Sequence, residues 1–365
     1  MEPMHFTYGD HRVEVALAPG AAAEGWEREL VDAGFMLPFQ HRVAYAELQP
    51  DPGPLFFIIR QPSGAVCGGF AAQRRRSHAL PGHTLLRVER FGEGVRSSQA
   101  RAAAIGALAD VSRHLPRVLR TYVGIFSEDV TVQGDIEAHL GRAGFTKNPD
   151  RRGYSRTAVV DLRPDEDAIL ASLHKTARSN IRAISRFPLE VRPVDTLEYV
   201  ERMQGLLTEA FARTGGETER EDWPSLLRFS ARYPQLSRVV GLFRSDRAGP
   251  ESLLAFVHGL HHGNHAEYSA GATSRDSEIR VSQTYALVWD LLRWARQYGA
   301  TFFDLGGITS PVNDGSDPLR GISAFKRYFT KEELYVGDEW VLEPSALRGS
   351  LARMVATVVH SVARS

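Results

Sequence analysis

The sequence predicts an α+β protein of two domains, and three observations carry that prediction. The chain has 365 residues, more than one hydrophobic core usually holds, so two domains are expected. Each half shows the same order of elements, in which antiparallel strands lead through a turn into a long helix and then a further strand. Hydrophobic residues make up 43% of the chain and charged residues 24%, as in globular proteins that fold on their own.

In the first half, short apolar runs bounded by Gly, Pro and Ser predict strands, and a 3.6-residue apolar period predicts helices. The strands are expected over 55–61, 65–73, 84–91 and 118–126, and the helices over 21–33, 97–114 and 136–143. The third strand ends in Gly92-Glu93-Gly94. Ser97 or Ser98 follows this turn and is a suitable N-cap for the long helix.

The second half repeats this order. Strands are expected over 155–162, 239–244, 253–261, 265–272, 301–307 and 334–342, and helices over 165–186, 282–298 and 345–364. The polar turn Asn148-Pro149-Asp150 predicts a boundary between domains of residues 1–153 and 154–365. The helix over 345–364 is apolar on one side, which is typical of a docking helix that covers an apolar surface of its own domain.

The charge balance limits the partners. The 44 basic and 44 acidic residues cancel, so no global field attracts nucleic acid. DNA binding is therefore not expected, and any binding of RNA or phosphate must come from a local patch. Only four of the basic residues are lysines: Lys147, Lys175, Lys326 and Lys331. Because lysines are so few in this arginine-rich chain, each one can be considered individually as a candidate functional residue.

Cysteine usage and hydropathy indicate the compartment. Cys67 is the single cysteine, so neither an intramolecular disulfide nor a cysteine-based zinc cage is expected. Residues 1–15 contain no basic start followed by an apolar run, and nowhere do about 18 uncharged apolar residues follow one another. We predict a cytoplasmic protein without a cofactor.

The first candidate site is a basic stripe on the helix expected over 165–186. Lys175, Arg178, Arg182 and Arg186 follow one another at steps of three and four residues, which places them on one helix face. Such a face can hold a diphosphate or an RNA backbone through charge-assisted hydrogen bonds. The alternative is a solvated face whose charges are balanced by acids elsewhere.

The second candidate site is the end of the strand over 301–307. Asp304 is followed by Gly306 and Gly307, which permit close backbone approach or a positive φ. Downstream, Lys326 stands between aromatic residues, so its stem can pack while its ammonium meets an anion. Asp304 is a candidate base, or it caps the glycine turn. Lys326 could equally be a surface lysine on an amphipathic helix.

Four histidines, His258, His261, His262 and His265, suggest a metal site. His258 and His262 would share a face only in a helix, and the alternation of this segment predicts a strand. No metal site is therefore expected.

The second half resembles the FemABX family of peptidoglycan aminoacyltransferases and their relatives in natural-product pathways. Three segments carry this resemblance: TAVVDLRPDEDAILASLHKTARSNIRAI, YGATFFDLGGI and GISAFKRYFTKEELYVGDEWVL, in order over roughly 157–342. The first half resembles the family through AGFMLPFQHRVAYAEL, whereas its FGEG replaces the family's arginine-glycine-proline turn. The resemblance implies two tandem GNAT-like (acyl-CoA N-acyltransferase-like) domains with the substrate held between them.

The resemblance also implies an activity. In the family, an aminoacyl-tRNA ester is attacked by an amine of a peptidoglycan precursor or small peptide, so aminoacyl-tRNA is the expected co-substrate and a lipid-linked acceptor would bring peripheral membrane contact. Lys326 matches the lysine of the FK-x-x-F motif and is the expected catalytic residue with Asp304, and Arg178 matches the K-x-x-R motif. The expected substrate-binding residues are Arg42, Lys175, Arg178, Arg182, Tyr268, Gly306, Gly307 and Phe325.

Two rival functions remain open. An acyl-CoA-dependent N-acyltransferase needs a turn of the type Gln/Arg-x-x-Gly-x-Gly/Ala before a helix, because backbone N–H groups must meet the pyrophosphate. Arg90-Phe91-Gly92-Glu93-Gly94 is one residue short of this spacing, and residues 272–282 lack it. The other rival is a catalytically silent binding protein with the same fold.

Overall fold

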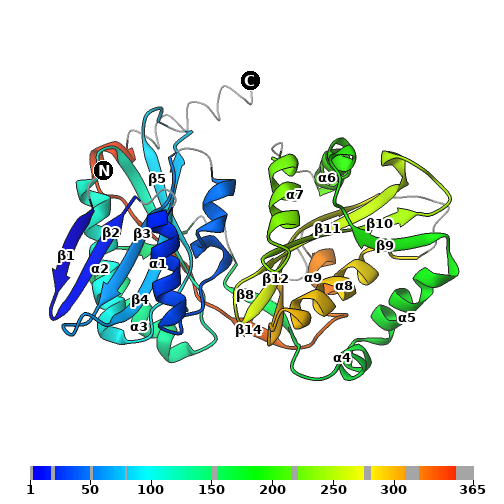
Figure 1. Cartoon of the computed structure of the whole chain (residues 1–365), viewed down its shortest axis with the longest axis horizontal. Helices are drawn as coiled ribbons and strands as arrows, with labels where there is room; N and C mark the ends of the chain where they lie inside the picture. The colour runs from blue at the N-terminus through cyan, green and yellow to red at the C-terminus, as the bar shows by residue number, and fades with distance from the viewer. Residues whose placement is uncertain are drawn as a thin grey trace. The chain divides into compact units, whose positions relative to one another are not determined.

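The computed structural model describes residues 3–17, 21–49, 52–78, 80–149, 154–214, 221–274, 281–308 and 320–350. The chain forms two compact units, one of Met1–Ser155 with Tyr335–Ser365 and one of Arg156–Leu334. In each unit, helices cover a β-sheet (Figure 1). The α+β class predicted from the sequence is confirmed.

The sheet of the first unit has the strand order β1-β2-β3-β4-β5-β6-β15-β7 among the described residues. Its strands are β1 (Met4–Tyr8), β2 (His11–Ala16), β3 (Leu55–Arg60), β4 (Val66–Arg76), β5 (Thr84–Phe91), β6 (Val118–Ile125), β7 (Thr146–Lys147) and β15 (Glu339–Leu342). β5 and β6 are parallel, and the long helix α2 (Ser98–His114) makes the crossover between them. The hairpin of β1 and β2 was not predicted from the sequence.

Helices cover both faces of this sheet. α2 and α3 (Val130–Arg142) share one hydrophobic cluster with Phe57 of β3, whereas α1 (Ala21–Asp32) packs in another cluster with Phe56 and Ile58. The short turns η1 (Phe39–His41) and η2 (Ala44–Leu48) lie between α1 and β3 in the sequence. The alternation of β3 between the two clusters is what a strand buried on both faces requires.

The N-cap predicted for α2 is confirmed, and the predicted start of α3 is wrong. Ser97 accepts a hydrogen bond from Ala100 N at 3.1 Å. α3 begins six residues before the expected position because Asp129 caps it through Thr131 N at 2.7 Å. Val130 in its first turn is 70% exposed, so the apolar period that reveals a helix does not mark this turn.

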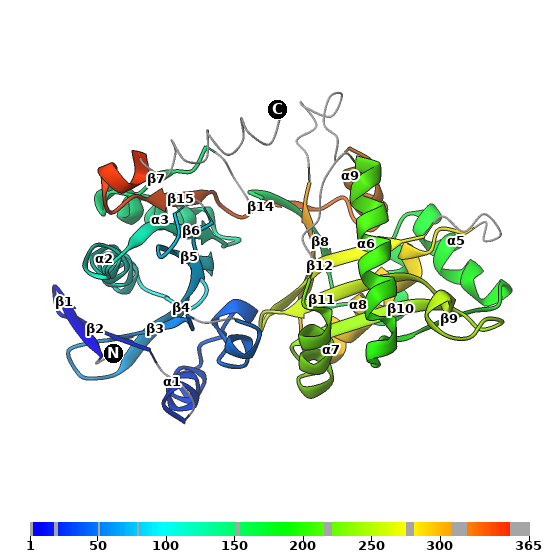
Figure 2. The ribbon, with the colours of Figure 1, turned by 90° about the horizontal axis from the view of Figure 1, so that it is seen from above.

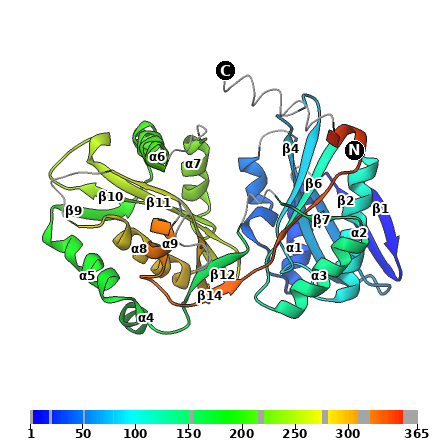
Figure 3. The same cartoon turned by 180° about the vertical axis from the view of Figure 1, so that it is seen from behind.

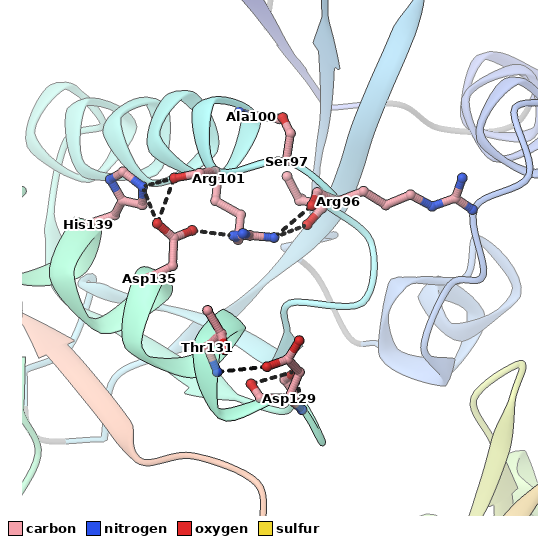
Figure 4. A network of polar contacts seen from close by, with 11 residues as sticks. Arg96, Ser97, Ala100, Arg101, Asp129, Thr131, Asp135 and His139 are labelled. Carbon is pink, nitrogen blue, oxygen red and sulfur yellow. Dashed lines mark hydrogen bonds and ion pairs between the residues drawn. The ribbon is translucent and has the colours of Figure 1, made fainter.

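A polar network joins α2 to α3 (Figure 4). Arg101 donates to Asp135 at 2.6 Å, and Ser98 donates to the other oxygen of Asp135 at 2.6 Å. Ser98 and Asp135 approach the same His139 atom, Nε2, each at 3.1 Å. Because both contacts meet one ring nitrogen, the histidine cannot relay a proton from one to the other as in a catalytic triad. The network therefore clamps two helices.

The sheet of the second unit has the strand order β14-β8-β13-β12-β11-β10-β9 among the described residues. Its strands are β8 (Arg156–Asp161), β9 (Leu189–Pro193), β10 (Ser237–Arg244), β11 (Leu253–His261), β12 (His265–Thr273), β13 (Phe302–Gly307) and β14 (Glu333–Tyr335). β12 and β13 are parallel. The pair thus corresponds to β5 and β6 of the first unit and repeats the architecture predicted from the sequence.

Two layers of helices enclose this second sheet (Figure 1). The helices are α4 (Glu166–Ser172), α5 (Lys175–Ala183), α6 (Val200–Thr214), α7 (Trp223–Arg232), α8 (Thr284–Gln297) and α9 (Arg320–Lys326), with short turns η3 (Ile184–Arg186), η4 (Leu197–Tyr199) and η5 (Pro250–Ser252). Val240 and Leu242 of β10 pack in a cluster with α5 and α8, and Val239 packs in one with α6 and α7. Alternate residues of β10 therefore face opposite layers.

The prediction of one helix over 165–186 is wrong. α4 ends at Ser172, and α5 begins at Lys175. Leu173 leaves the helix with φ −62° and ψ 152° and is buried, with 1% of its surface exposed. His174 then caps α5 by accepting a hydrogen bond from Thr176 N at 3.2 Å. The apolar period continues across the break because both short helices face the same core.

The single strand expected over 334–342 is two strands separated by a corner at Gly337. The φ of Gly337 is +118°, and a Cβ there would stand 2.6 Å from Ile125, so this corner requires glycine. β15 then pairs with β6 and β7 in the first sheet (Figure 2), although the sequence placed this segment in the second half. Of the helix expected over 345–364, residues 346–350 are helical, and residues 351–364 lie outside the described residues.

Candidate active site in the second unit

The site begins where β12 and β13 diverge. The two strands pair only from His265 with Phe302 to Glu267 with Asp304. Beyond this point β12 continues beside β11 as far as Thr273, whereas β13 bends and pairs again with β8 at Gly307. A gap therefore opens in the middle of the sheet, where side chains from neighbouring helices can enter.

Lys326, the last residue of α9, lies at this gap. Its side chain is buried, and Nζ donates a hydrogen bond to the Gly307 carbonyl at 2.7 Å. Burial lowers the pKa of Lys326 to about 8, against an opposing contribution from the Asp304 carboxylate. The neighbouring Phe325 ring packs against Tyr285 of α8 at 4.9 Å, so α9 lies beside α8 (Figure 3). Because Lys326 is buried, the alternative of a surface lysine on an amphipathic helix is wrong.

Gly306 makes room for the ammonium. Its φ is +81°, and a Cβ at this position would stand 3.2 Å from Lys326 Nζ. Any other residue would meet both backbone strain and a close contact with the ammonium. The predicted glycine turn thus brings the backbone close to Lys326.

Asp304 supports the same turn from inside the sheet. Its carboxylate is fully buried and accepts hydrogen bonds from the Thr157 hydroxyl and, at 2.7 Å, from Gly306 N. It is not among the described residues that line the adjacent pocket. This geometry suits the capping alternative for Asp304 better than the role of a base, because a base must reach the reacting proton.

A pocket of about 560 Å³ adjoins Lys326. Its described lining residues are Leu207, Ala210 and Phe211 of α6, residues 268–273 of β12, Thr284 of α8, Leu305 of β13, and Gly321, Ile322, Phe325 and Lys326 of α9. Burial raises the pKa of Tyr268 to about 12, so its phenol is neutral. The expected site residues Tyr268, Phe325 and Lys326 thus line one pocket.

The basic stripe lies at a different pocket. Lys175 and Arg178 line a hollow of about 710 Å³ together with Arg327 and Lys331. Arg178 donates to the Leu173 carbonyl and, at 2.8 Å, to the Ala171 carbonyl, so its guanidinium holds the end of α4. Arg178 and Lys326 thus line two different pockets of the second unit.

Two further expected contact residues, Arg182 and Arg42, are not among the described residues that line the two pockets. Arg182 is exposed in the last turn of α5. Arg42 belongs to the first unit, where it pairs with Glu27 at 2.9 Å and donates to the Leu37 carbonyl at 3.1 Å. The Arg42 guanidinium therefore ties α1 to the segment that follows it.

The glycine turn of the first unit packs against its own sheet. The Gly94 carbonyl accepts a hydrogen bond from Gly69 N at 2.9 Å, and a Cβ at Gly94 would stand 2.4 Å from the Gly69 carbonyl oxygen. Arg101 donates to the Arg96 carbonyl at 2.9 Å, and one carboxylate oxygen of Glu93 is fully buried. A buried acid and close backbone packing oppose a pyrophosphate at this turn.

The four histidines lie on the hairpin of β11 and β12, and the strand predicted for this segment is confirmed. His258 Nε2 lies 2.9 Å from the Ser237 hydroxyl, and burial lowers the pKa of His258 to about 4. Within the described ranges, no group of three or more His, Cys, Asp or Glu side chains is placed to hold a metal ion. Nor does this part of the chain include a helix with the length and apolar character that a bilayer crossing requires.

The wall that α6 contributes to the pocket was not predicted from the sequence. Phe211 of α6 and Ile322 of α9 are 40% and 46% exposed, although large apolar residues are usually buried. The apolar period of α6 already predicts a buried face. It does not indicate that this face ends at a pocket, because the other walls come from distant segments.

These features define the class of protein: each unit has the GNAT-like order of strands and helices, and the chain is a tandem GNAT-fold protein. No family model and no curated protein matches the sequence, but solved structures do. The fold is similar to that of FemX, with a TM-score of 0.69 and 14% identity over 93% of this chain and 97% of that chain.

Two other solved structures are similar. A tandem GNAT protein from the clavulanic acid biosynthesis pathway has a TM-score of 0.52 and 14% identity over 91% of this chain and 99% of that chain. L-PGS from Bacillus licheniformis has a TM-score of 0.51 and 14% identity over 95% and 98% of the two chains. At such identities the likeness shows the fold, and at that level the predicted resemblance to the FemABX family is confirmed.

Proposed function

We propose that the second unit carries the transfer centre of an aminoacyltransferase, which moves an aminoacyl group from aminoacyl-tRNA to an amine of a peptidoglycan precursor or small peptide. The observation that carries this proposal is the position of Lys326, a buried ammonium beside a pocket where two parallel strands diverge. The FemX-like fold supports the same function by analogy.

The reaction forms an amide from an ester. The acceptor nitrogen attacks the ester carbonyl, a C–N bond forms, and the C–O bond to the terminal ribose breaks. A proton passes from the amine to the ribose oxygen, so the products are an amide and uncharged tRNA. Negative charge gathers on the carbonyl oxygen as the nitrogen adds.

Lys326 is suited to stabilise that charge. With a pKa of about 8, the side chain is mainly protonated at neutral pH, and its hydrogen bond to the Gly307 carbonyl fixes the ammonium at the gap. A preorganised donor of this kind typically contributes about 10²-fold to 10³-fold to kcat. Asp304 acts in this proposal as a positioning residue, because it holds the Gly306 turn against which the ammonium lies.

The second hollow supports a phosphate-bearing substrate because its basic lining residues, Lys175, Arg178, Arg327 and Lys331, outnumber its acidic ones, Asp161 and Glu332. Arg327 has a carboxylate partner, Glu333, whereas Lys175 and Lys331 are exposed at the rim. Exposed ammonium groups bind phosphate as flexible point charges, and their contribution weakens with salt. In the proposal this hollow contacts a phosphate of the tRNA or of the acceptor.

An acyl-CoA-dependent N-acyltransferase is the rival, and it is supported by the similar fold of the clavulanic acid pathway protein, whose structure is described as that without AcCoA. Against it stand the buried carboxylate oxygen of Glu93 and the close packing of Gly94 on β4 in the first unit. A catalytically silent binding protein is the other rival, and the buried ammonium of Lys326 argues against it because burying an ammonium has a free-energy cost.

The test is transfer by the full chain to a mixture of peptides and peptidoglycan precursors, analysed by mass spectrometry. One arm supplies a complete tRNA-charging system, a second adds ribonuclease, and a third supplies acetyl-CoA and longer acyl-CoAs without tRNA. The proposal expects amide products that need charged tRNA and vanish with ribonuclease. Products that form from acyl-CoA and resist ribonuclease would establish the rival enzyme, and no product in any arm would favour the binding protein.

A further inference from the structure

The walls of the pocket beside Lys326 are unusually poor in charge. Of its lining residues that the structure describes, Lys326 is the one with an ionisable charge at neutral pH, since Tyr268 is a neutral phenol. The polar groups are otherwise hydroxyls, and leucine, isoleucine, phenylalanine, alanine and glycine supply the rest. A cationic substrate group deep in this pocket would lose water without gaining a partner. An anionic group would find one ionic partner among the described lining residues, the Lys326 ammonium, which already donates a hydrogen bond to the Gly307 carbonyl.

Two large apolar side chains are exposed at the same pocket. Phe211 of α6 and Ile322 of α9 line it and keep 40% and 46% of their surfaces accessible. Exposed apolar side chains that gather at one hollow mark a binding site for an apolar group, because burial by the ligand removes their surface from water.

Small residues keep the hollow open. Ala210 on α6 and Ala270 on β12 line it, and a Cβ at the neighbouring Gly271 would stand 2.2 Å from the Tyr268 hydroxyl oxygen and 2.9 Å from the Phe256 carbonyl oxygen. A larger residue at these positions would enter the hollow or displace Tyr268. The resulting volume of about 560 Å³ lies within the range of pockets that enclose sizeable ligands, so a glycyl or alanyl group would leave most of it unfilled.

We propose that this pocket selects a bulky apolar acyl group, whose side chain lies between α6 and β12 while its carbonyl oxygen meets the Lys326 ammonium. The proposal rests on the proposed function for the source of that group, a leucyl-like or phenylalanyl-like ester of tRNA. The shared chemistry, an apolar chain attached to an acyl carbonyl, also occurs in acyl thioesters of CoA, and the experiment separates the two sources.

The experiment measures binding to the full chain by titration calorimetry. The probes are 3′-aminoacylamido-3′-deoxyadenosines, stable amide mimics of the charged tRNA end that carry glycyl, alanyl, aspartyl, lysyl, leucyl or phenylalanyl groups. Burial of one CH₂ group contributes about 0.8 kcal/mol to the free energy of binding, which corresponds to an affinity about fourfold higher. We expect the leucyl and phenylalanyl probes to bind at least tenfold more tightly than the alanyl, glycyl, aspartyl and lysyl probes.

A pair of variants places the effect in this pocket. Ala210→Phe fills the hollow and should weaken the leucyl probe at least tenfold while leaving the glycyl probe within threefold. Ala212→Phe, on the exposed side of the same helix, should bind like the unchanged protein. If Ala210→Phe does not fold, the smaller change Ala210→Val should lower leucyl affinity in the same direction.

The outcomes distinguish the two proposals. Equal or tighter binding of alanyl or charged probes, or no loss of leucyl binding in the Ala210 variants, would overturn the apolar specificity and leave the proposed function standing. If no aminoacyl probe binds but octanoyl-CoA does, with the same dependence on Ala210, the apolar pocket stands and the tRNA-dependent function falls. Absence of binding by both leucyl probe and octanoyl-CoA would overturn the pocket proposal.

Discussion

The substitution Gly306→Ala tests whether the backbone turn holds the Lys326 ammonium in place. At a φ of +81°, a residue with a Cβ costs about 1–2 kcal/mol of folding free energy. The new Cβ would stand 3.2 Å from Lys326 Nζ, closer than ordinary van der Waals contact, so the ammonium must move. The hydrogen bond from Nζ to the Gly307 carbonyl, now 2.7 Å, should weaken or break.

Gly299→Ala is the matched control. Gly299 follows α8 with a φ of +86°, and a Cβ there would meet no atom of the described residues within 4 Å. Denaturant unfolding should therefore show a similar loss of unfolding free energy in both variants, roughly 1–2 kcal/mol. Only Gly306→Ala should transfer more slowly, by roughly tenfold or more in single-turnover assays. Equal activity in the two variants would refute the claim that the turn positions Lys326.

Three further predictions concern charge. The ratio of the single-turnover rates of the unchanged protein and Lys326→Met should fall as pH rises through about 8, where Lys326 loses its proton, because ionisation of the acceptor amine affects both proteins alike. A ratio that rises over that range would instead indicate that the neutral Lys326 amine acts as a base. Arg178→Ala should lower the melting temperature through the loss of its hydrogen bonds to α4 carbonyls and leave the salt dependence of KM unchanged; a salt-dependent rise in KM without destabilisation would restore the phosphate role. The free energy of unfolding should fall as the pH is lowered from about 6.5 to about 4. Burial lowers the pKa values of His41 and His258 to about 4, so in this range only the unfolded chain takes up these protons. Each histidine should then contribute a loss of about 1.4 kcal/mol per pH unit. Denaturant titrations across this range, with His258→Asn showing a smaller slope, check it.

The sequence predicted the elements whose signals are local. The N-cap at Ser97, the bounds of β11 and the glycine turn at Gly306 follow from neighbouring residues alone. Lys326 was identified because a rare lysine among aromatic residues is a local pattern as well. Its burial and lowered pKa depend on β12, β13 and α9 together, and these segments are far apart in the chain.

The errors share one physical cause, since each needed tertiary information. The apolar period continues through Leu173, so the residue pattern does not show that the helix ends there; the break follows from how the two helices pack on the core. β15 has ordinary strand residues, and nothing in them tells which sheet they join. Arg178 has the spacing of a ligand-binding residue. Its guanidinium instead donates a hydrogen bond to a backbone carbonyl at the end of α4, and the sequence does not indicate that this carbonyl lies within reach.

The central claim is that the Lys326 ammonium stabilises the transition state of acyl transfer, and single-turnover transfer by Lys326→Met tests it most directly. Methionine keeps an unbranched apolar stem in the buried site and removes the charge. Lys147→Met, at an exposed lysine of the first unit, is the control. The account predicts a rate at saturating substrate about 100-fold lower for Lys326→Met, with a cooperative melting transition retained and with Lys147→Met within about twofold of the unchanged protein. A rate for folded Lys326→Met close to that of the unchanged protein would contradict the account.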